Sequence, residues 1–373
     1  MKTLFLVLTV ILTVSCYELT STATSSNPPK SPARQSNAEL SNQKAPRLSL
    51  FASNEPFVHD LVVSAGKIIG VGTGAKSPSD ELFVMEEGST NRWVGQPLDE
   101  LTNSFVDAKD ISLKAGTLWL AASGGVVMKK PESGCCWENL TRVPSAEATF
   151  ISFADSTVGY VLARAFNKNE SGLRVFKTSD GGRSWTRVLE DLRAGNPFDL
   201  VVVDRKTVIV AMNDEYILRT SDGGDTWAYS EITPRERKID RSDWIKLNDS
   251  GASDLELFED TVWVVGERGS FYSSTDHGKT WSRPQVLPEL LRSEAIRSIA
   301  FSSSGNGVAV GENGLIIGSN DRGKTWFLVP ENVTTTVLLD KAIGKGKENL
   351  HSVKFVDDTA MILGERGVYT FSF

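Results

Sequence analysis

Short runs of alternating apolar and polar residues, separated by turns, fill the chain from about residue 47 onward. The segment 295–326 shows the order clearly. Its three apolar runs, around Ile299, Val308 and Leu315, are followed by a polar turn that ends in Trp326. Runs of this length with a period of two predict β-strands, and the Gly, Ser and Asn residues between them predict tight turns. No long stretch has a helical period, so we expect an all-β protein.

The polar turn that follows the third run occurs in four copies. Each copy has Ser or Thr two residues before an Asp, Gly two residues after it, Ser or Thr four after and Trp five after. Asp, Ser and Thr side chains accept hydrogen bonds from nearby backbone N–H groups, Gly tolerates positive φ, and Trp buries a large ring. We therefore expect a structural hairpin turn, here named the Asp-Trp turn. The four copies contain Asp180 and Trp185, Asp222 and Trp227, Asp276 and Trp281, and Asp321 and Trp326.

The four Asp residues lie 42, 54 and 45 positions apart, a period typical of solenoids and propellers. Degenerate copies end at Trp137 and near Trp93, and a last unit after Val353 has three strands and no Asp-Trp turn. Because an open ring would leave an unpaired edge, we expect the alternating residues Arg47–Phe51 to supply the missing strand. The prediction is a seven-bladed β-propeller of four-stranded antiparallel blades over residues 47–373, closed by an N-terminal strand that completes the last blade.

The N-terminal 46 residues differ in character from the rest. Residues 1–16 combine a Lys with an apolar run too short to cross a bilayer of ~30 Å as a helix, which predicts an export signal. Leu12–Cys16 resembles a bacterial lipobox, although Thr13 stands where Leu is commonest, so Cys16 is the predicted acylation site. The alternative is an ordinary signal peptide and a secreted protein. Residues 17–46 are rich in Ser, Thr, Pro and Asn and predict a disordered tether.

Composition and charge exclude some classes of function. The net charge of −7 argues against a nucleic-acid backbone as the main partner. Cys135 and Cys136 are neighbours, so they form either a strained disulfide with a switching role or two thiols that fill space in a degenerate turn. There is no Cys-x-x-Cys pattern and the His residues are scattered, so we expect no metal site and no cofactor. The three His residues are His59, His277 and His351.

Binding residues are expected on one face of the ring. In a four-stranded meander, the turn between strands two and three and the link to the next blade share one face, and the Asp-Trp turns lie on the other. Charged turns and the long link 231–253 fall on the first face, where loops on a rigid scaffold concentrate binding residues. Taken singly, each charged turn is better explained as a solvated hairpin tip. The candidates are Glu267, Arg268, Glu312, Glu365, Arg366, Arg235, Arg237, Arg241 and Trp244.

The repeat also carries a family resemblance. Val-x-Val-Gly-Glu-x-Gly, an apolar strand and the Asp-Trp turn together resemble the photosystem II stability/assembly factor family over about Arg47 to Phe373. The Asp-Trp turn itself resembles the Asp box, or BNR repeat, of sialidases and sortilin-like receptors. The family resemblance implies a non-enzymatic, monomeric propeller whose arginine-bearing face receives a partner polypeptide during assembly of a membrane complex. It maps that role most directly to Arg268 and Arg366, with the link arginines. The export signal and the lipobox predict a location in the bacterial periplasm or at the cell surface.

A sialidase-like or other glycoside hydrolase is the alternative. Sialidases need three converging arginines, a tyrosine nucleophile and an acid. Their Arg-Ile-Pro signature is absent, and the nearest match, Arg142-Val143-Pro144, follows the second repeat instead of preceding the first. A glucanase-type pair of acids drawn from different blades would leave no local signature. Three arginines around one point would favour the sialidase, whereas a broad basic face would favour the scaffold.

Overall fold

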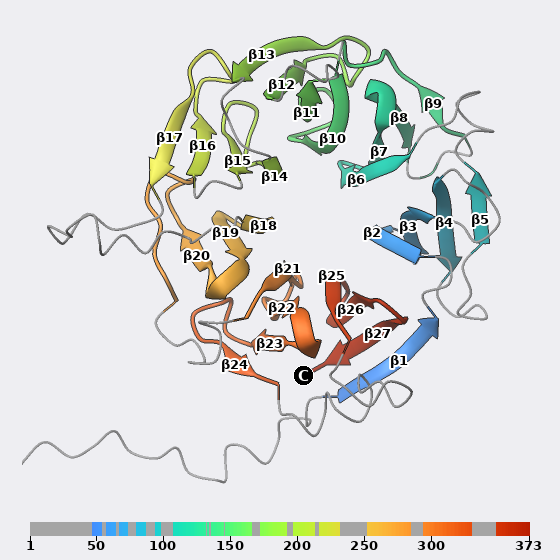
Figure 1. The fold of residues 1–373 in the computed structure, drawn as a ribbon, viewed down its shortest axis with the longest axis vertical. Helices are drawn as coiled ribbons and strands as arrows, with labels where there is room; N and C mark the ends of the chain where they lie inside the picture. The colour runs from blue at the N-terminus through green and yellow to red at the C-terminus, as the bar shows by residue number, and fades with distance from the viewer. Residues whose placement is uncertain are drawn as a thin grey trace, which may run out of the picture. The chain divides into compact units, whose positions relative to one another are not determined.

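Antiparallel sheets follow one another around a ring in the described part of the chain (Figure 1). The computed structural model describes residues 47–53, 57–64, 67–73, 80–86, 94–97, 107–131, 133, 136–144, 146–165, 172–191, 197–212, 216–231, 252–284, 294–329 and 348–373. All of them belong to one of two units of the chain, Lys44–Phe373. Seven sheets are formed by these residues, and we number them blade 1 to blade 7 along the chain.

Each blade runs outward from a first strand that faces the centre of the ring (Figure 1). Blade 1 holds β2 (Phe57–Ser64), β3 (Lys67–Thr73), β4 (Asp80–Glu86) and β5 (Val94–Pro97), and blade 2 holds β6 (Ala108–Lys114), β7 (Thr117–Ala122), β8 (Val126–Pro131) and β9 (Glu138–Asn139). Blade 3 holds β10 (Ala146–Phe153), β11 (Gly159–Ala165), β12 (Leu173–Thr178) and β13 (Thr186–Asp191), and blade 4 holds β14 (Pro197–Val202), β15 (Val208–Met212), β16 (Tyr216–Thr220) and β17 (Ala228–Glu231).

Blades 5 to 7 repeat the plan, with short 3-10 turns after some second strands. Blade 5 holds β18 (Ala252–Phe258), β19 (Thr261–Gly266) and β20 (Phe271–Ser274), and blade 6 holds β21 (Ile296–Phe301), β22 (Gly307–Gly311), β23 (Ile316–Ser319) and β24 (Phe327–Leu328). Blade 7 holds β25 (Leu350–Val356), β26 (Thr359–Gly364), β27 (Gly367–Ser372) and the N-terminal β1 (Arg47–Ser53). The 3-10 turns are η2 (Ser123–Gly125), η4 (Glu267–Gly269) and η6 (Glu312–Gly314).

The closing strand is where the alternation of residues 47–51 predicted it. β1 pairs antiparallel with β27, from Arg47 opposite Ser372 to Ser53 opposite Gly367, with one irregularity between Leu50 and Ala52. The strand therefore continues two residues beyond the predicted Phe51. The first and last strands of the ring thus share one sheet, and β27 has no open edge.

Blade 5 departs from the expected four strands within the described residues. Its outer position is reduced to a single bridge, in which Ser273 and Ser282 exchange two backbone hydrogen bonds of 2.8 and 2.9 Å. Pro284 follows two residues later. Because proline has no N–H to donate, the ladder cannot be extended through that position. The prediction of a full fourth strand in every blade is wrong here.

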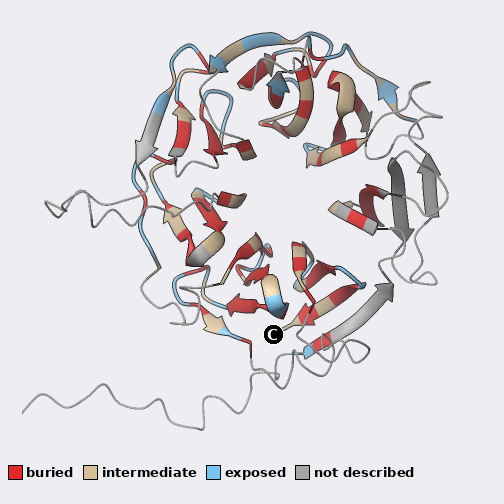
Figure 2. Ribbon diagram, viewed as in Figure 1, coloured by how far each residue is buried: buried red, intermediate tan, exposed pale blue. Residues whose placement is uncertain are grey.

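The second strands are apolar without alternation because neighbouring blades cover both of their faces. β15 and β22 are buried at every position. Aromatic rings join adjacent blades: Trp119 stacks on Phe153 at 3.8 Å, and Trp263 packs edge-on to Trp326 at 5.8 Å. Buried residues gather on the inner strands, and exposed ones appear along outer strands such as β13 (Figure 2). The core is therefore a set of clusters between blades.

The four Asp-Trp turns share one hydrogen-bond pattern. In the first copy, the Thr178 hydroxyl donates to Asp180 (2.8 Å) and accepts from Gly182 N–H (2.9 Å), while Asp180 also accepts from Ser184 N–H (2.9 Å). Gly182 has a φ of 89°, in the left-handed region that favours glycine. The same bonds occur around Asp222, Asp276 and Asp321. Trp281 and Trp326 are buried, whereas Trp185 and Trp227 are half-buried.

Candidate functional site

The two faces of the ring carry different turns. Each Asp-Trp turn follows the third strand of its blade, and in blades 3, 4 and 6 it bonds to the turn between strands one and two, as in Gly181 N–H to Thr157 O (2.9 Å). The turns between strands two and three instead bond to inter-blade links, as in Glu312 N–H to Ala295 O (3.0 Å). Because successive strands are antiparallel, these two sets of turns lie on opposite faces. We call the face that carries η2, η4, η6 and the turn Glu365–Arg366 the turn face.

Arg297 joins blades 5 and 6 on the turn face. Its guanidinium lies 3.6 Å from Glu267 Oε1 of η4 and also pairs with Glu312 Oε1 of η6. The three side chains are each exposed by about a third or more, with 33% for Arg297, 40% for Glu267 and 37% for Glu312. The structure therefore brings together two predicted glutamates through an arginine that the sequence did not single out.

Blades 6 and 7 are joined by a chain of polar contacts. Asn349 accepts from Asn313 N–H (3.1 Å) and donates to Glu365 Oε1 (2.9 Å). Arg366 lies beside Glu348, which accepts from the Arg366 backbone N–H at 2.8 Å and lies 3.5 Å from its Nε. The Glu348 side chain is 1% exposed, whereas that of Arg366 is 40% exposed. The guanidinium is thus held on its buried side by Glu348 and is partly exposed to solvent.

A buried tyrosine and a histidine complete this region. The Tyr369 hydroxyl donates to Glu348 Oε1. Burial, followed by this hydrogen bond and the carboxylate charge, raises the pKa of Tyr369, so the phenol stays protonated. Burial lowers the pKa of His351 against the opposing effect of nearby carboxylates such as Glu365, so its neutral form is favoured near pH 7.

The remaining predicted positions fall outside what the structure describes. Only the backbone of Arg268 is described, within η4. Arg235, Arg237, Arg241 and Trp244 lie outside the described residues, as do the lipidation candidate Cys16 and the neighbour Cys135. Cys136 is exposed. Among the described residues, no His, Cys, Asp and Glu side chains gather in a group that suits a metal ion, and no helix is long and apolar enough to cross a bilayer.

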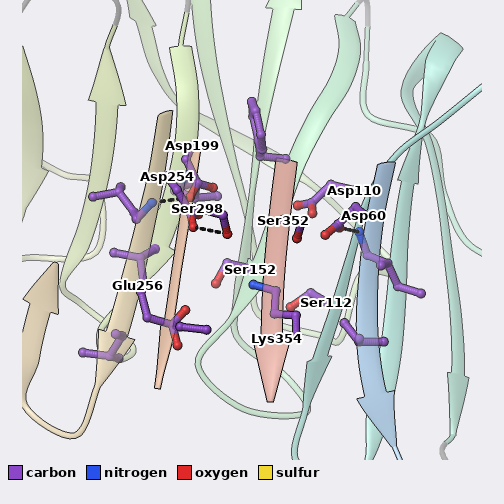
Figure 3. A pocket seen from close by; sticks show the side chains of 18 of the residues that line it. Asp60, Asp110, Ser112, Ser152, Asp199, Asp254, Glu256, Ser298, Ser352 and Lys354 are labelled. Atoms are coloured by element: carbon purple, nitrogen blue, oxygen red, sulfur yellow. Dashed lines mark hydrogen bonds between the residues drawn. The ribbon is translucent and has the colours of Figure 1, made fainter. Parts of the chain in front are cut away.

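A second polar feature lies at the centre of the ring. The first strands line a cavity of about 570 Å³, and Arg297 and His351 are also among its lining residues. Figure 3 shows four aspartates, Glu256 and Lys354 pointing into it, with Asp254 and Glu256 both on β18. The aspartates are Asp60 of β2, Asp110 of β6, Asp199 of β14 and Asp254 of β18.

Repeated backbone irregularities place these aspartates. Every first strand shifts register by one residue against its second strand, which is the mark of a β-bulge. The residue just after the bulge is Asp, Ser or, in blade 3, Phe150. Most of the polar ones accept a backbone N–H of the next blade, and we call these contacts clamps. The clamps join Asp60 to Ile111 N–H (3.1 Å), Asp110 to Ile151 (2.7 Å), Asp199 to Leu255 (2.7 Å), Asp254 to Ile299 (2.8 Å) and Ser298 to Val353 (3.2 Å).

Two junctions lack such a clamp within the described residues. Phe150 has no side-chain acceptor, and the corresponding N–H of blade 4, on Leu200, donates to the adjacent Asp199 at 2.7 Å. Leu61 of blade 1 likewise donates to the adjacent Asp60 at 2.8 Å. Each of these aspartates therefore uses one oxygen within its own blade and the other for the next blade.

Sequence analysis missed the central cluster because its members lie about one repeat apart. A signal was nonetheless present. Asp or Ser followed by Leu, Ile or Val recurs near the start of six of the seven first strands, beside the bulge. The pairs are Asp60-Leu61, Asp110-Ile111, Asp199-Leu200, Asp254-Leu255, Ser298-Ile299 and Ser352-Val353.

Comparisons with known proteins find similarity to the same family that the repeat motif resembles. No model of a known protein family matches the chain. A curated relative, the photosystem II assembly lipoprotein Ycf48 of Synechococcus sp. (strain CC9902), is 22% identical over 192 residues, which are 50% of this chain and 51% of the relative. The chain thus spans about half the length of the curated relative it matches.

Solved structures cover nearly the whole ring. The structure of YCF48 bound to D1 peptide aligns with a TM-score of 0.59 at 15% identity, over 89% of this chain and 96% of that one. YCF48 from Cyanidioschyzon merolae gives 0.58 at 15% identity, over 88% and 99%. The RRP9 WD40 repeats give 0.57 at 10% identity, so at this level structural similarity defines the fold and not the function. The chain is a β-propeller that is similar in fold to the Ycf48 photosystem II assembly factors and similar to them in sequence across about half of its length, as the family resemblance of its repeats indicated.

Proposed function

We propose that the chain is an exported, non-enzymatic scaffold whose turn face receives a partner polypeptide during assembly of a membrane complex. The observation that carries the proposal is the row of charged side chains from three consecutive blades, on the face opposite the Asp-Trp turns. The structural relative described as bound to D1 peptide, and the curated relative described as an assembly lipoprotein, support a role in binding protein. The proposed partner of this chain is a subunit of a membrane complex.

The anchored Arg366 gives this face its recognition chemistry. Glu348 holds the guanidinium from the buried side, and the exposed part can meet a carboxylate or carbonyl of a bound peptide. Arginine suits such contacts because its planar donors match carboxylate geometry. Arg297 is held by two glutamates, so it contributes to a mixed-charge surface. The backbone of Arg268 lies in η4 of blade 5, so we include this residue in the proposed surface.

Removing or reversing a positive charge on each face tests the docking role. Arg268→Glu and Arg366→Gln are expected to weaken partner binding, whereas Lys324→Glu, an exposed position within an Asp-Trp turn, is expected to leave it unchanged. The full-length protein is cross-linked in membranes of its source, the partner is identified by mass spectrometry, and its affinity for each variant is then measured. Equal binding by all three variants would contradict the proposal. Thermal midpoints identify any loss due to misfolding.

The proposed architecture is a lipid at Cys16, a tether over residues 17–46 and a monomeric ring over residues 47–373, located in the periplasm or on the cell surface. Mass spectrometry of the mature N-terminus should find an acylated Cys16. Cys16→Ser is expected to move the protein from the membrane to the soluble fraction. An unmodified N-terminus after residue 16 would instead support the secreted alternative.

A further inference from the structure

The cavity at the centre of the ring concentrates acidic groups. Five carboxylates point into it, from Asp60, Asp110, Asp199, Asp254 and Glu256, and Lys354 of β25 is the ammonium among the side chains drawn there (Figure 3). The clamps fix the orientation of the four aspartates, so they cannot turn away from one another without losing bonds between blades. The cavity therefore holds like charges at fixed positions.

The aspartates are arranged as two pairs. Asp60 and Asp110 lie together on one side of the cavity and Asp199 and Asp254 on the other (Figure 3), and within each pair the charge of one carboxyl acts on the other. Two close carboxylates resist simultaneous ionisation, which favours one proton per pair. The crowding of fixed carboxyls thus points to protons held within the cavity.

We propose that the central cavity is a proton-binding element in which the pairs Asp60–Asp110 and Asp199–Asp254, together with Glu256, hold protons near neutral pH and make closure of the ring pH-sensitive. At acidic pH each pair binds a proton, the repulsion between its carboxyls is removed, and the contacts between blades become stronger. Loss of the protons at alkaline pH leaves repelling charges at the centre of the ring. This role is independent of what binds to the turn face.

Burial and neighbouring charges raise the pKa values of these carboxyls, which also favours bound protons. Burial, and then the Asp60 charge, raises the pKa of Asp110 well above its usual value, and burial with the Asp254 charge does the same for Asp199. Burial raises the pKa of Glu256 to about 7. Burial acts to lower the pKa of Lys354, but Glu256 and the aspartates outweigh it and raise that pKa. The ammonium therefore stays charged while the carboxyls take up protons.

Charged and titratable groups from six of the seven strands that line this cavity bear on the cluster. Arg297 of β21 pairs with Glu267 and Glu312 of the turn face, and carboxylates such as Glu365 act electrostatically on His351 of β25. Lys109 of β6 pairs with Asp107 and Glu147, so its charge is largely compensated. The described groups to be considered are Asp60, Lys109, Asp110, Lys114, Asp199, Asp254, Glu256, Arg297, His351 and Lys354.

The sign of the pH effect follows from proton linkage. A carboxyl whose pKa is higher in the folded state binds more protons folded than unfolded, so its contribution to stability is present at low pH and is lost as pH rises through the folded pKa. One unit of pKa corresponds to a factor of about ten in the unfolding equilibrium. Between pH 5 and pH 8, the unfolding equilibrium constant is therefore expected to rise about tenfold or more.

Replacement of one member of each pair by asparagine provides the test. Asp110→Asn and Asp199→Asn keep an acceptor for the clamp but remove the titrating group. Unfolding of the full-length wild type in weak buffer at pH 7.5 is expected to release at least one proton per molecule. The double variant should release fewer, and its urea midpoint should vary less between pH 5 and pH 8. Asp260→Asn, an exposed site in the same blade as Glu256, is the control and should match the wild type.

A second variant tests the counter-charge. Lys354→Met removes the ammonium, so the carboxyls should hold their protons to higher pH, and the urea midpoint should fall more at pH 8 than at pH 5. Lys324→Met, at an exposed position of an Asp-Trp turn on the face opposite the turn face, should lower both midpoints equally or not at all. The proposal is overturned if the double asparagine variant releases as many protons as the wild type, or if Lys354→Met has the same effect at both pH values.

Discussion

Replacing Asp254 by alanine tests the clamps between blades most directly. Asp254 Oδ2 accepts from Ile299 N–H at 2.8 Å and from the Ser298 hydroxyl at 2.8 Å, and both belong to the next blade. Ile299 is fully buried and Ser298 is 4% exposed, so water cannot readily replace the lost acceptor. Alanine would leave a buried N–H without a partner, which costs about 1–3 kcal/mol, and would weaken the hydroxyl contact by about 1 kcal/mol.

Charge relief opposes this loss. Asp254 is one of the charges that raise the pKa of Glu256, and it also raises that of Asp199. Removing it relieves repulsion within the cavity, which offsets part of the loss. The net expectation for Asp254→Ala is a loss of about 1–3 kcal/mol in the free energy of unfolding.

Asp254→Asn separates the two effects because it removes the charge and keeps an acceptor. We expect it to unfold within about 1 kcal/mol of the wild type, and to be about 2 kcal/mol more stable than Asp254→Ala. Urea unfolding at pH 7, followed by tryptophan fluorescence, measures both values. If the two variants have the same midpoint, the clamp contributes nothing and the reasoning about blade contacts is refuted.

Three further predictions concern other parts of the ring. Gly323→Ala should lower stability by about 1–3 kcal/mol, because φ is 81° and a Cβ would lie 2.4 Å from the Trp263 ring; Gly305→Ala, at a φ of 97° and 2.7 Å from a flexible arginine, should cost less by the same urea assay. Deletion of residues 47–53 should expose the edge of β27 and cause self-association, visible by sedimentation. Hydrogen bonds led by that from Ser184 lower the pKa of Asp180 to about 2, so the thermal midpoint gap between wild type and Asp180→Asn should persist at neutral pH and shrink as pH falls toward 2.

The repeat and its closure could be predicted because their causes are local. The Asp-Trp turn contains its own donors, acceptors and left-handed glycine, so each copy is legible within eight residues. The alternation at residues 47–51 likewise predicted a strand that had no neighbouring strands in the sequence to pair with, and this strand pairs with β27. The missing fourth strand of blade 5 also has a local cause, because Pro284 cannot donate to the ladder.

The central cluster and Arg297 could not be predicted in the same way. Whether Asp110 meets Asp60 depends on the angle between blades and on a bulge in each first strand, and these emerge only when the ring closes. Arg297 lies at the bulge of β21 and reaches two different blades. Contacts between residues of different blades cannot be predicted from the sequence of any one segment.

The pairing of β1 with β27 also determines how the ring responds to mechanical force. Arg47 and Ser372 face each other at one end of the ladder, and Ser53 and Gly367 at the other. Tension applied between Arg47 and Phe373 would enter at a single end and part the residue pairs one after another, as a zip opens, instead of loading all of them together. Pulled by these two residues, the circle should come apart at low force even though its interior is tightly filled.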